Sequence, residues 1–350
     1  MTQEFIYSEL KTKLHDVVPD VELHLKAKIA FEINQLKVKR NAVILGHNYM
    51  EPALFHSIPD YSGDSLELSR IAAKTEKDII VFCGVRFMAE TAKILSPQKT
   101  VLIPAVKAGC SLADGITAED VRLLKSRYPG VPVVTYINTS AAVKAESDIC
   151  CTSSNAIAVV QSFKGETVIF LPDEYLARNV ARATRKHIIF PSLVGDKPES
   201  DTLLDKPIIG WNARCEVHEK FTLEDIQNIR KQFRDVLILS HPECSPEVVA
   251  ASDFSGSTTQ MIKHVQRTKA SRYLLLTECS MGDNIMAANP GKNMLRLCSV
   301  RCPHMNEITM EDTLEALRLT RYVVEVPEPI RVRALKAVER MLEIIPSAAD

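Results

Sequence analysis

The run "AVILGHNY" (residues 42–49) is a stretch of small and branched apolar residues that ends in polar side chains, and the chain repeats this arrangement twice. The other two copies are "VPVVTYIN" (131–138) and "DVLILSHPE" (235–243). Runs this rich in Val, Ile and Leu are typical of strands that are buried on both faces, as in parallel sheets. The three runs therefore predict three sheet-forming segments of one kind.

The features that follow each run recur in the same order. Measured from His47, Tyr136 and His241, a small polar residue that precedes a helical pattern comes 16 to 18 positions later, and a second apolar run begins after 32 or 33 positions. A third apolar run follows, and a cysteine comes seven to nine positions after its start. The small polar residues are Ser65, Ser153 and Ser257, the later runs start at Ile79, Val168 and Leu274 and at Val101, Ile208 and Met294, and the cysteines are Cys110, Cys215 and Cys302.

These repeats predict an α/β fold with three pseudo-symmetric, small parallel-sheet αβα units. Units packed around a pseudo-threefold axis would be arranged in a triangle around a central active site. Functional residues in parallel sheets gather beyond the carboxyl ends of the strands, so the polar run ends and the cysteines should all face that centre. The expected segments are an N-terminal helical segment (1–40), three α/β units (41–125, 126–230 with a polar surface insertion at 192–205, and 231–305) and a C-terminal helical tail (306–350).

Composition limits the possible classes of function. The 43 basic and 44 acidic side chains give a net charge of −1, which provides no overall attraction to nucleic acid or acidic membranes. The first residues lack the apolar stretch of a signal peptide, and no run approaches the roughly 20 apolar residues of a membrane helix. We therefore expect a cytoplasmic protein without nucleic-acid or membrane partners. The odd number of cysteines, nine, argues against a disulfide scaffold.

The three cysteines of the repeat predict a metal centre to which each unit contributes one ligand. Three thiolates suit either zinc or an iron–sulfur cluster, and they leave one metal position open for water or substrate. Cys298, in "LRLCSVRCPHM" (295–305), is a second candidate ligand beside Cys302, but the register of the repeat favours Cys302. The alternative interpretations are a zinc-dependent hydrolase or aldolase that acts on an anionic small molecule, and a non-catalytic module that binds anions or sugar phosphates.

The polar ends of the three runs predict a cavity with groups for acid–base chemistry. Glu243 is the best candidate base because it is the only acid among them. Hydroxyl groups expected at helix N-caps, where free N–H groups attract anions, predict a substrate with carboxylate or phosphate groups. The run-end residues are His47, Asn48, Tyr49, Tyr136, Asn138, His241 and Glu243, and the hydroxyl residues at helix N-termini are Ser65, Ser153, Ser257 and Thr258.

Eight motifs between about Asn41 and Met305 together resemble the quinolinate synthase family, also called quinolinate synthetase A. The resemblance implies a triangular protein with one [4Fe-4S] cluster per chain, held by three cysteines with one iron free. It also implies a transferase that condenses iminosuccinate (iminoaspartate) with dihydroxyacetone phosphate, giving quinolinate, phosphate and water in de novo NAD biosynthesis. The motifs are "GHNY", "GDSLELSR", "GVRFMAETAKIL", "YINTSAAVKA", "CTSSNA", "HPE", "GSTTQM" and "CPHM".

The resemblance also implies roles for individual residues. Glu243 resembles the family's acid–base residue, and Tyr49 and His218 resemble members of the catalytic pocket. Cys110 in "AGCSL", Cys215 in "ARCEVHE" and Cys302 in "RCPHM" resemble the cluster ligands. The residues that resemble substrate contacts are His47, Ser65, Tyr136, Asn138, Ser153, His241, Glu243 and Thr258.

Two further implications concern partners and a departure from the family. The implied partners are the two small substrates, with a functional link to L-aspartate oxidase or aspartate dehydrogenase. Some relatives carry CxxCxxC before the proline, whereas this chain has only Cys298 and Cys302 there. The additional thiol pair of those relatives therefore cannot form here in the same way.

Overall fold

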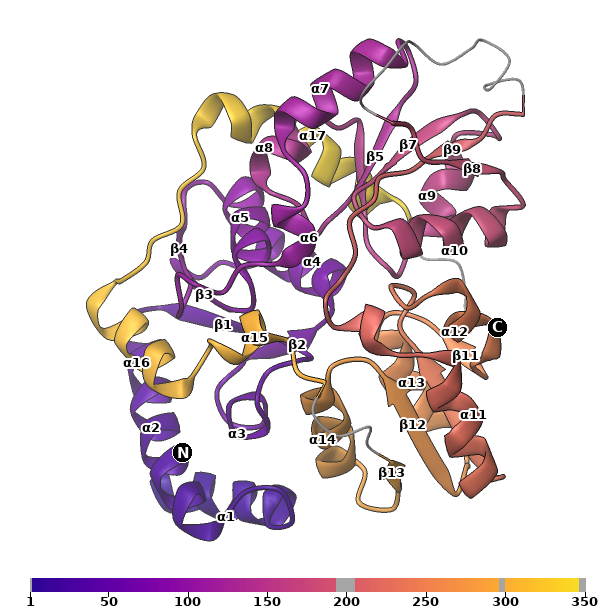
Figure 1. Ribbon diagram of the computed structural model, residues 1–350. Coiled ribbons are helices and arrows are strands. Elements are labelled where there is room, and N and C mark those ends of the chain that lie inside the picture. Colours follow the sequence, from indigo (N-terminus) through magenta and orange to yellow (C-terminus); the bar gives the residue numbers. More distant parts are fainter. Residues whose placement is uncertain (1, 193–204, 296–299, 346–350) are drawn as a thin grey trace.

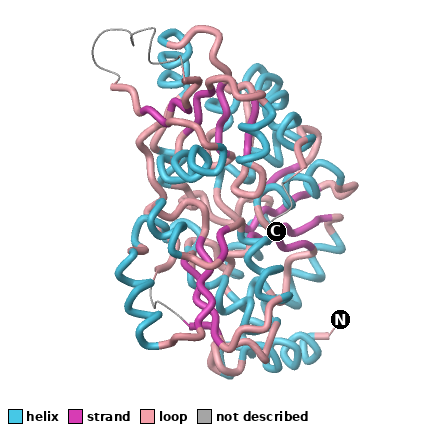
Figure 2. Tube along the Cα trace, turned by 90° about the vertical axis from the view of Figure 1, so that its right-hand side faces the viewer, coloured by secondary structure: helices cyan, strands magenta, loops and turns pink. Residues whose placement is uncertain are grey.

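Three small sheets lie at the corners of a triangle in the computed structural model, which describes residues 2–192, 205–295 and 300–345 (Figure 1). All named strand pairs in these sheets are parallel. Helices pack around each group of strands, as the view turned by 90° also shows (Figure 2). The predicted α/β fold with three parallel-sheet units is confirmed, and the unit boundaries stay a prediction. Most of the predicted insertion, 193–204, lies outside the described residues.

The three sheets share one strand order. The first unit has the order β2-β1-β3-β4, the third has β11-β10-β12-β13, and the middle unit has β6-β5-β7-β9 with β8 added at its edge. The strands are β1 (Ala42–His47), β2 (Tyr61–Gly63), β3 (Ile79–Cys83), β4 (Thr100–Leu102), β5 (Val133–Tyr136), β6 (Ile149–Cys151), β7 (Val168–Leu171), β8 (Ile188–Ile189), β9 (Ile208–Ile209), β10 (Val236–Ser240), β11 (Phe254–Ser255), β12 (Arg272–Leu276) and β13 (Met294–Leu295).

Each sheet contains a short strand beside its first strand that the three apolar runs of the sequence do not include, and the middle sheet also contains β8. The additional strands β2, β6 and β11 are two or three residues long, and β2 and β11 carry polar or aromatic residues such as Tyr61 and Phe254. So short a strand has no periodic pattern of its own, and its backbone pairing with the first strand of the unit defines it. Sequence patterning missed these strands for that reason.

An aspartate in front of each additional strand ties that strand to the first strand of its unit. Its carboxylate accepts a hydrogen bond from a backbone N–H of the first strand, and its own N–H donates to a carbonyl of the same strand. The pairs are Asp60 with Ile44, Asp148 with Val133 and Asp253 with Ile238, and the N–H to carboxylate distance is 2.8 Å in each. These aspartates mark structurally equivalent positions in the three units.

Helices occupy the connections between the strands. The first unit has α3 (Pro52–Phe55), α4 (Ser65–Lys74), α5 (Arg86–Leu95), α6 (Ser111–Asp114) and α7 (Ala118–Arg127). The second has α8 (Ala141–Ala145), α9 (Ala156–Ser162), α10 (Glu174–Thr184), the 3-10 turn η2 (His218–Lys220) and α11 (Leu223–Gln232), and the third has α12 (Pro246–Ala251), α13 (Thr258–Arg267), α14 (Cys279–Ala288) and α15 (Pro303–Asn306). The ends of the chain form α1 (Gln3–Leu14), α2 (Asp20–Lys39), α16 (Met310–Leu319) and α17 (Glu328–Glu343).

A second repeat begins six residues after each predicted cysteine ligand. The sequences "ITAED" (116–120), "FTLED" (221–225) and "ITMED" (308–312) start α7, α11 and α16. In each, the threonine hydroxyl caps the helix by accepting the aspartate N–H at 3.0 to 3.2 Å, and it donates to the aspartate carboxylate at 2.7 Å. Reciprocal bonds of this kind satisfy N–H groups that the first helical turn leaves free.

The C-terminal helices return to the first two units. Helix α16 packs against α2 and β3, and Arg40 donates a hydrogen bond to Thr320 at 2.7 Å. The segment after it pairs with the edge of β4 through Val324 and Val101. Helix α17 packs against α5, α8 and β6, so that one hydrophobic core runs through the first two units and the tail. Among the described helices, none is both long and apolar enough to cross a membrane.

Candidate active site and metal centre

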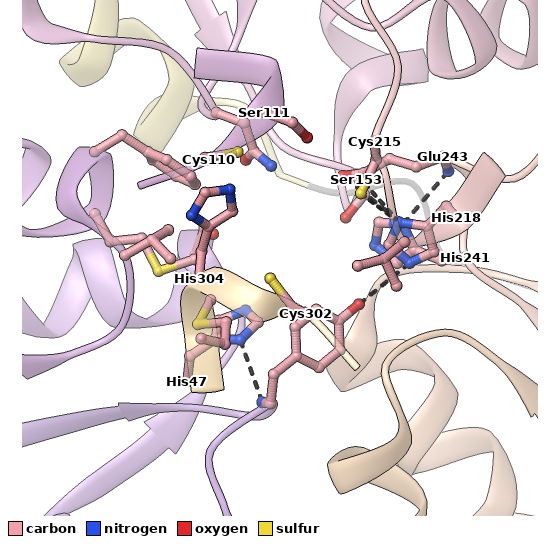
Figure 3. A pocket seen from close by; sticks show the side chains of 18 of the residues that line it. His47, Cys110, Ser111, Ser153, Cys215, His218, His241, Glu243, Cys302 and His304 are labelled. Atoms are coloured by element: carbon pink, nitrogen blue, oxygen red, sulfur yellow. Dashed lines mark hydrogen bonds and ion pairs between the residues drawn. The ribbon is translucent and has the colours of Figure 1, made fainter. Parts of the chain in front are cut away.

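A central cavity lies where the three units meet, and all three contribute to its wall (Figure 3). The polar side chains come from the carboxyl ends of strands and from the loops that follow them, where a parallel sheet places functional groups. Predicted site residues that line the cavity are His47, Tyr49, Ser65, Cys110, Tyr136, Asn138, Ser153, Cys215, His218, His241, Glu243, Thr258 and Cys302. Ser257 is not among the lining residues.

The three predicted cysteine ligands face the cavity from three sides (Figure 3). Cys110 and Cys302 occupy the N-cap positions of α6 and α15, and Cys215 lies in the loop before η2. Each of the three stands seven residues before a threonine that caps the next helix, so they occupy equivalent positions in the repeat. Cys298 has no such relation and lies outside the described residues. The structure thus brings together the trio that the sequence register favoured.

These thiols do not lie close enough together to share a single metal ion. Three thiolates on a single zinc, with bonds of about 2.3 Å, lie about 4 Å apart. Among the described side chains, the set of three potential ligands whose atoms all lie within 4.8 Å of one another is Cys215, His218 and Glu243, and the cysteine trio does not form such a set. An iron–sulfur cluster, which is bound through separate irons, accommodates the wider spacing.

Burial keeps the cysteine thiols protonated unless a cation binds. It raises the pKa of Cys110 to about 12 and that of Cys302 to about 11. Neutral thiols are poor nucleophiles, whereas a bound metal deprotonates its thiol ligands. Without a bound cation, these three thiols are therefore poor nucleophiles.

Glu243 and His218 form a buried carboxylate–imidazole pair across the second and third units. Oε2 of Glu243 lies 2.8 Å from Nδ1 of His218, and Oε1 accepts a hydrogen bond from the Tyr136 hydroxyl. Burial alone would raise the pKa of Glu243, but the adjacent His218 imidazole and the hydrogen bonds from His218 and Tyr136 hold it below its ordinary value. An ionised carboxylate only accepts, so Nδ1 of His218 carries a proton and donates it to this hydrogen bond; in the neutral imidazole, Nε2 is then an acceptor.

Two hydroxyl groups face the other side of the His218 ring. Nε2 lies 3.0 Å from Oγ1 of Thr277 and 3.5 Å from the Tyr49 hydroxyl, and the two hydroxyls contact each other. Burial, reinforced by Glu243, raises the pKa of Tyr49 well above its usual value, so its phenol stays protonated. The resulting order, Tyr49 and Thr277, then His218, then Glu243, is a chain along which a proton can move.

His47 and His241, two further imidazoles of the cavity, are neutral at physiological pH. Burial lowers the pKa of His47 to about 4 and that of His241 to about 3. The His241 ring stacks on His218 with 4.5 Å between ring centres, and Nδ1 of His47 accepts the Tyr49 backbone N–H at 3.3 Å. Neutral imidazoles can donate or accept hydrogen bonds to a substrate without adding charge.

The hydroxyl rim of the cavity differs from the prediction in its register. Ser65 and Thr258 are the first residues of α4 and α13, and Asp64 and Ser257 are the N-caps. Ser153 lies two residues before Asn155, the N-cap of α9. The N-cap assignments of Ser65 and Ser153 were therefore wrong, because Asp64 and Asn155 occupy that position in these two loops.

The aspartate repeat shows which hydroxyls are equivalent. Ser65, Ser153 and Thr258 each stand five residues after Asp60, Asp148 and Asp253, and all three line the cavity. Ser257 is instead equivalent to Asp64, and its hydroxyl donates to the Asp64 carboxylate at 2.9 Å. The predicted contact of Ser257 with substrate has no support from this geometry, because that hydroxyl is directed to Asp64.

Sequence patterning missed several residues of the site. Thr277 follows β12 directly, where the first and middle units have Gly84 and Pro172, so its hydroxyl is unique to the third unit. His304, two residues after Cys302, lines the cavity and lies 3.0 Å from Glu216, the neighbour of Cys215. The polar residue after the second strand and the "CPH" spacing were the available signals.

Comparison with known proteins identifies the family. The quinolinate synthetase A protein family matches residues 31–343. Quinolinate synthase 2 of Mesorhizobium japonicum is 52% identical over 335 residues, covering 96% of this chain and 97% of that protein. The quinolinate synthase of Agrobacterium fabrum is 53% identical over 312 residues, with 89% and 84% covered, and that of Caulobacter vibrioides 47% over 338 residues, with 95% and 86% covered.

The chain belongs to the quinolinate synthetase A family. This confirms the predicted family, and with it an enzyme of quinolinate formation in NAD biosynthesis. It also confirms small-molecule substrates, and iron–sulfur binding is a feature of the family that the cysteines of the cavity fit. The zinc-dependent hydrolase or aldolase is not favoured.

Proposed function

We propose that the chain condenses iminosuccinate with dihydroxyacetone phosphate to give quinolinate, phosphate and water. The observation that carries this proposal is the convergence, in one cavity, of three equivalent cysteines and the Glu243–His218 pair. The reaction joins two small anions and removes several protons and hydroxyl groups. It therefore needs anion-binding groups, acid–base groups and a Lewis acid within reach of each other.

Cys110, Cys215 and Cys302 would hold one [4Fe-4S] cluster. Their one-per-unit placement, their equivalence in the repeat and their spacing support this ligand set. When bound, such a cluster supplies an iron without a protein ligand, which acts as a Lewis acid on a substrate oxygen. His218, whose Nδ1 lies 3.2 Å from Sγ of Cys215, connects the ligand set to the proton-transfer groups.

Proton transfer is assigned to Glu243, His218 and Tyr49. Glu243 orients His218, whose Nε2 lies within hydrogen-bonding distance of the Tyr49 and Thr277 hydroxyls. Because the pKa of Glu243 lies below its ordinary value, the carboxylate is a weak base by itself. Its acid–base role is therefore carried out together with the imidazole that it orients.

Substrate binding is assigned to the neutral polar rim of the cavity. The hydroxyl groups at helix N-termini suit carboxylate or phosphate groups, because free N–H groups and the helix dipole attract anions there. The neutral imidazoles and the amide add donors without charge. The residues assigned to substrate are His47, Ser65, Tyr136, Asn138, Ser153, His241 and Thr258.

The iminosuccinate substrate is unstable in water, so an enzyme that oxidises aspartate should supply it. We assign this supply to L-aspartate oxidase or aspartate dehydrogenase, and the cell compartment to the cytoplasm.

Anaerobic turnover tests the proposal. Purified enzyme is incubated with freshly generated iminosuccinate and dihydroxyacetone phosphate, and the product is identified by mass spectrometry. Quinolinate, with release of phosphate in equal amount, is the expected result. The absorption spectrum and the content of iron and labile sulfide are measured on the same sample. A colourless protein with one zinc and no sulfide, or a coloured one that forms no quinolinate, would overturn the proposal.

A further inference from the structure

Asp64 is a buried carboxylate whose hydrogen-bonding capacity is fully used. It is the N-cap of α4, and Oδ1 accepts the backbone N–H groups of Leu66 and Glu67 at 3.1 and 3.0 Å. Oδ2 accepts the hydroxyls of Ser154 and Ser257, both at 2.9 Å. An ionised carboxylate offers about four acceptor positions, and these four bonds occupy them. The side chain is therefore held in one position.

These partners come from all three units. Asp64 belongs to the first unit, Ser154 to the second and Ser257 to the third. The backbone N–H of Asp64 also donates to Oγ1 of Thr259 in the third unit at 3.2 Å, and that hydroxyl donates to Glu67 at 3.0 Å. A single carboxylate thus joins three segments that are distant in sequence.

Each of these three residues is the sequence neighbour of a hydroxyl that faces the cavity. Ser65 follows Asp64, Ser153 precedes Ser154, and Thr258 follows Ser257. Positions of adjacent residues are coupled through the planar peptide bond. Fixing the Asp64 cluster (Asp64, Ser154 and Ser257) therefore fixes the relative positions of the three equivalent hydroxyls of the cavity rim.

Asp64 also separates the cavity from the protein surface. It lines the central cavity on one side and a second, surface pocket on the other, and the two sets of lining residues share only Asp64. The surface pocket contains Arg70 and Lys263. Opening of the Asp64 cluster would connect the two spaces.

We propose that Asp64 is a positioning residue that aligns Ser65, Ser153 and Thr258 for the anionic groups of the substrates and closes the cavity wall between the three units. This proposal rests on the proposed function in naming substrate anions as the ligands. The alignment itself is a property of the three-unit structure. Asp64 acts through its serine partners and not on the reacting atoms.

The sign of the change in KM distinguishes alignment by Asp64 from a simple effect of its charge. Asp64 places a negative charge beside a site for anions, so charge alone predicts that its removal strengthens substrate binding. Alignment predicts the opposite, because loss of the cluster releases the hydroxyls that bind the anion. The two explanations therefore give opposite changes in KM.

The principal variant is Asp64→Asn, which keeps the shape of the side chain and the Oδ1 acceptor for the helix cap. Its amide nitrogen would face the two serine hydroxyls, which can no longer donate at that position. We expect KM for dihydroxyacetone phosphate to rise about tenfold, with a smaller change in kcat. A fall in KM would overturn the proposal. Asp225→Asn is the matched control, because it changes the capping carboxylate of α11, which does not line the cavity, and KM should not change.

Ser154→Ala and Ser257→Ala test the same cluster with milder changes, should Asp64→Asn fail to fold. Each removes one donor to Oδ2, and neither side chain lines the cavity. We expect each to raise KM, and the double variant to differ from the sum of the two effects because they share one acceptor. Unchanged KM in both single variants would contradict the proposal.

Amide hydrogen exchange separates this proposal from the proposed function. In Asp64→Asn we expect faster exchange in the peptides around residues 64–68, 152–156 and 256–260, which belong to three units. Faster exchange around 64–68 alone would show a local helix cap and refute alignment. If the wild-type enzyme forms no quinolinate, the proposed function fails, while the exchange result still decides whether Asp64 joins the units.

Discussion

The outer connections and the cavity rim follow the same threefold repeat, but only the connections keep the same residues. The capping pairs of α7, α11 and α16 are Thr and Asp in all three cases. The residue that ties the additional strand of each unit to its first strand is likewise an aspartate in all three units. At the rim, the equivalent residues at the ends of the first strands differ: they are His47, Tyr136 and His241. The positions directly before the three rim hydroxyls also differ: they hold Asp64, Thr152 and Ser257.

This difference separates the demands of folding from those of chemistry. The connections solve one local problem, a free helix end or a free strand N–H, and the same residue solves it three times. The rim surrounds substrates that have no threefold symmetry, so each unit contributes a different group. The cysteines are the exception, and the proposed cubane cluster would explain this, because it would present similar irons to all three units.

Loss of a cysteine should give the largest effect and should be equal in the three units. We expect Cys110→Ser, Cys215→Ser and Cys302→Ser each to abolish bound iron and quinolinate formation, because two remaining thiolates do not hold the cluster. Iron content and anaerobic activity are the measurements. Cys298→Ser should keep most of both. If Cys298→Ser loses the cluster and Cys302→Ser retains it, the equivalence of the three cysteines is broken.

Glu243→Gln should impair the acid–base pair, which has no equivalent in the other two units. Only the third unit places an acid at the polar end of its first strand, and the amide cannot hold the His218 tautomer in the same way. We expect kcat to fall by about 100-fold or more, a typical acid–base contribution, with the cluster intact. Turnover is measured beside the iron content of the same preparation. Normal turnover would remove the assigned role.

The pH dependence of stability should report the two buried imidazoles of the rim. The folded pKa of His47 is about 4 and that of His241 about 3, both below the ordinary value of 6.5. Between pH 6.5 and 4 the unfolded chain binds more protons, so the free energy of unfolding falls as pH falls, by about 1.4 kcal/mol per pH unit for each imidazole. Thermal unfolding at several pH values tests this.

His47→Asn provides the matching variant for this measurement. It removes one of the two imidazoles, so the unfolding temperature should fall less steeply with decreasing pH than in the wild type. A wild-type protein that is as stable at pH 5 as at pH 7 would contradict the assigned neutral state of both rings.

The helix caps should give the smallest effects, and these should be alike. We expect Thr117→Ala, Thr222→Ala and Thr309→Ala each to lower the free energy of unfolding by about 1 kcal/mol, because each removes one capping hydroxyl. KM should stay unchanged, since the threonines do not line the cavity. Unfolding in denaturant and steady-state kinetics check the two parts. A cap variant that changed KM would contradict the conclusion that the connections serve folding and the rim serves substrate binding.

Long apolar runs and their polar ends made most of the fold predictable from the sequence. The first strand of each unit is buried in nearly every position, and a pattern of that kind is readable without tertiary information. Strands β2, β6, β8 and β11 were not readable, because two or three residues become a strand only through the neighbour with which they pair.

Those residues of the candidate site that come shortly after a predicted strand could be predicted from the sequence. Cys110, Cys215 and Cys302 line one cavity as the repeat required. Thr277 and Asp64 escaped notice because their importance depends on partners in other units, to which sequence spacing gives no access. Ser257 was matched to Ser65 and Ser153 because positions were counted from the end of the first strand. Counting from Asp253, which binds that strand, matches Thr258 to them instead.

The return of α16 and α17 to the first two units has a consequence for synthesis on the ribosome. Strand β3 and helix α2 are made early, yet α16, which covers them, emerges only after about nine-tenths of the chain. Domains generally fold in the order in which they leave the ribosome. Here the earliest unit must wait with an uncovered apolar face, so its nascent form is the one that a chaperone would meet first.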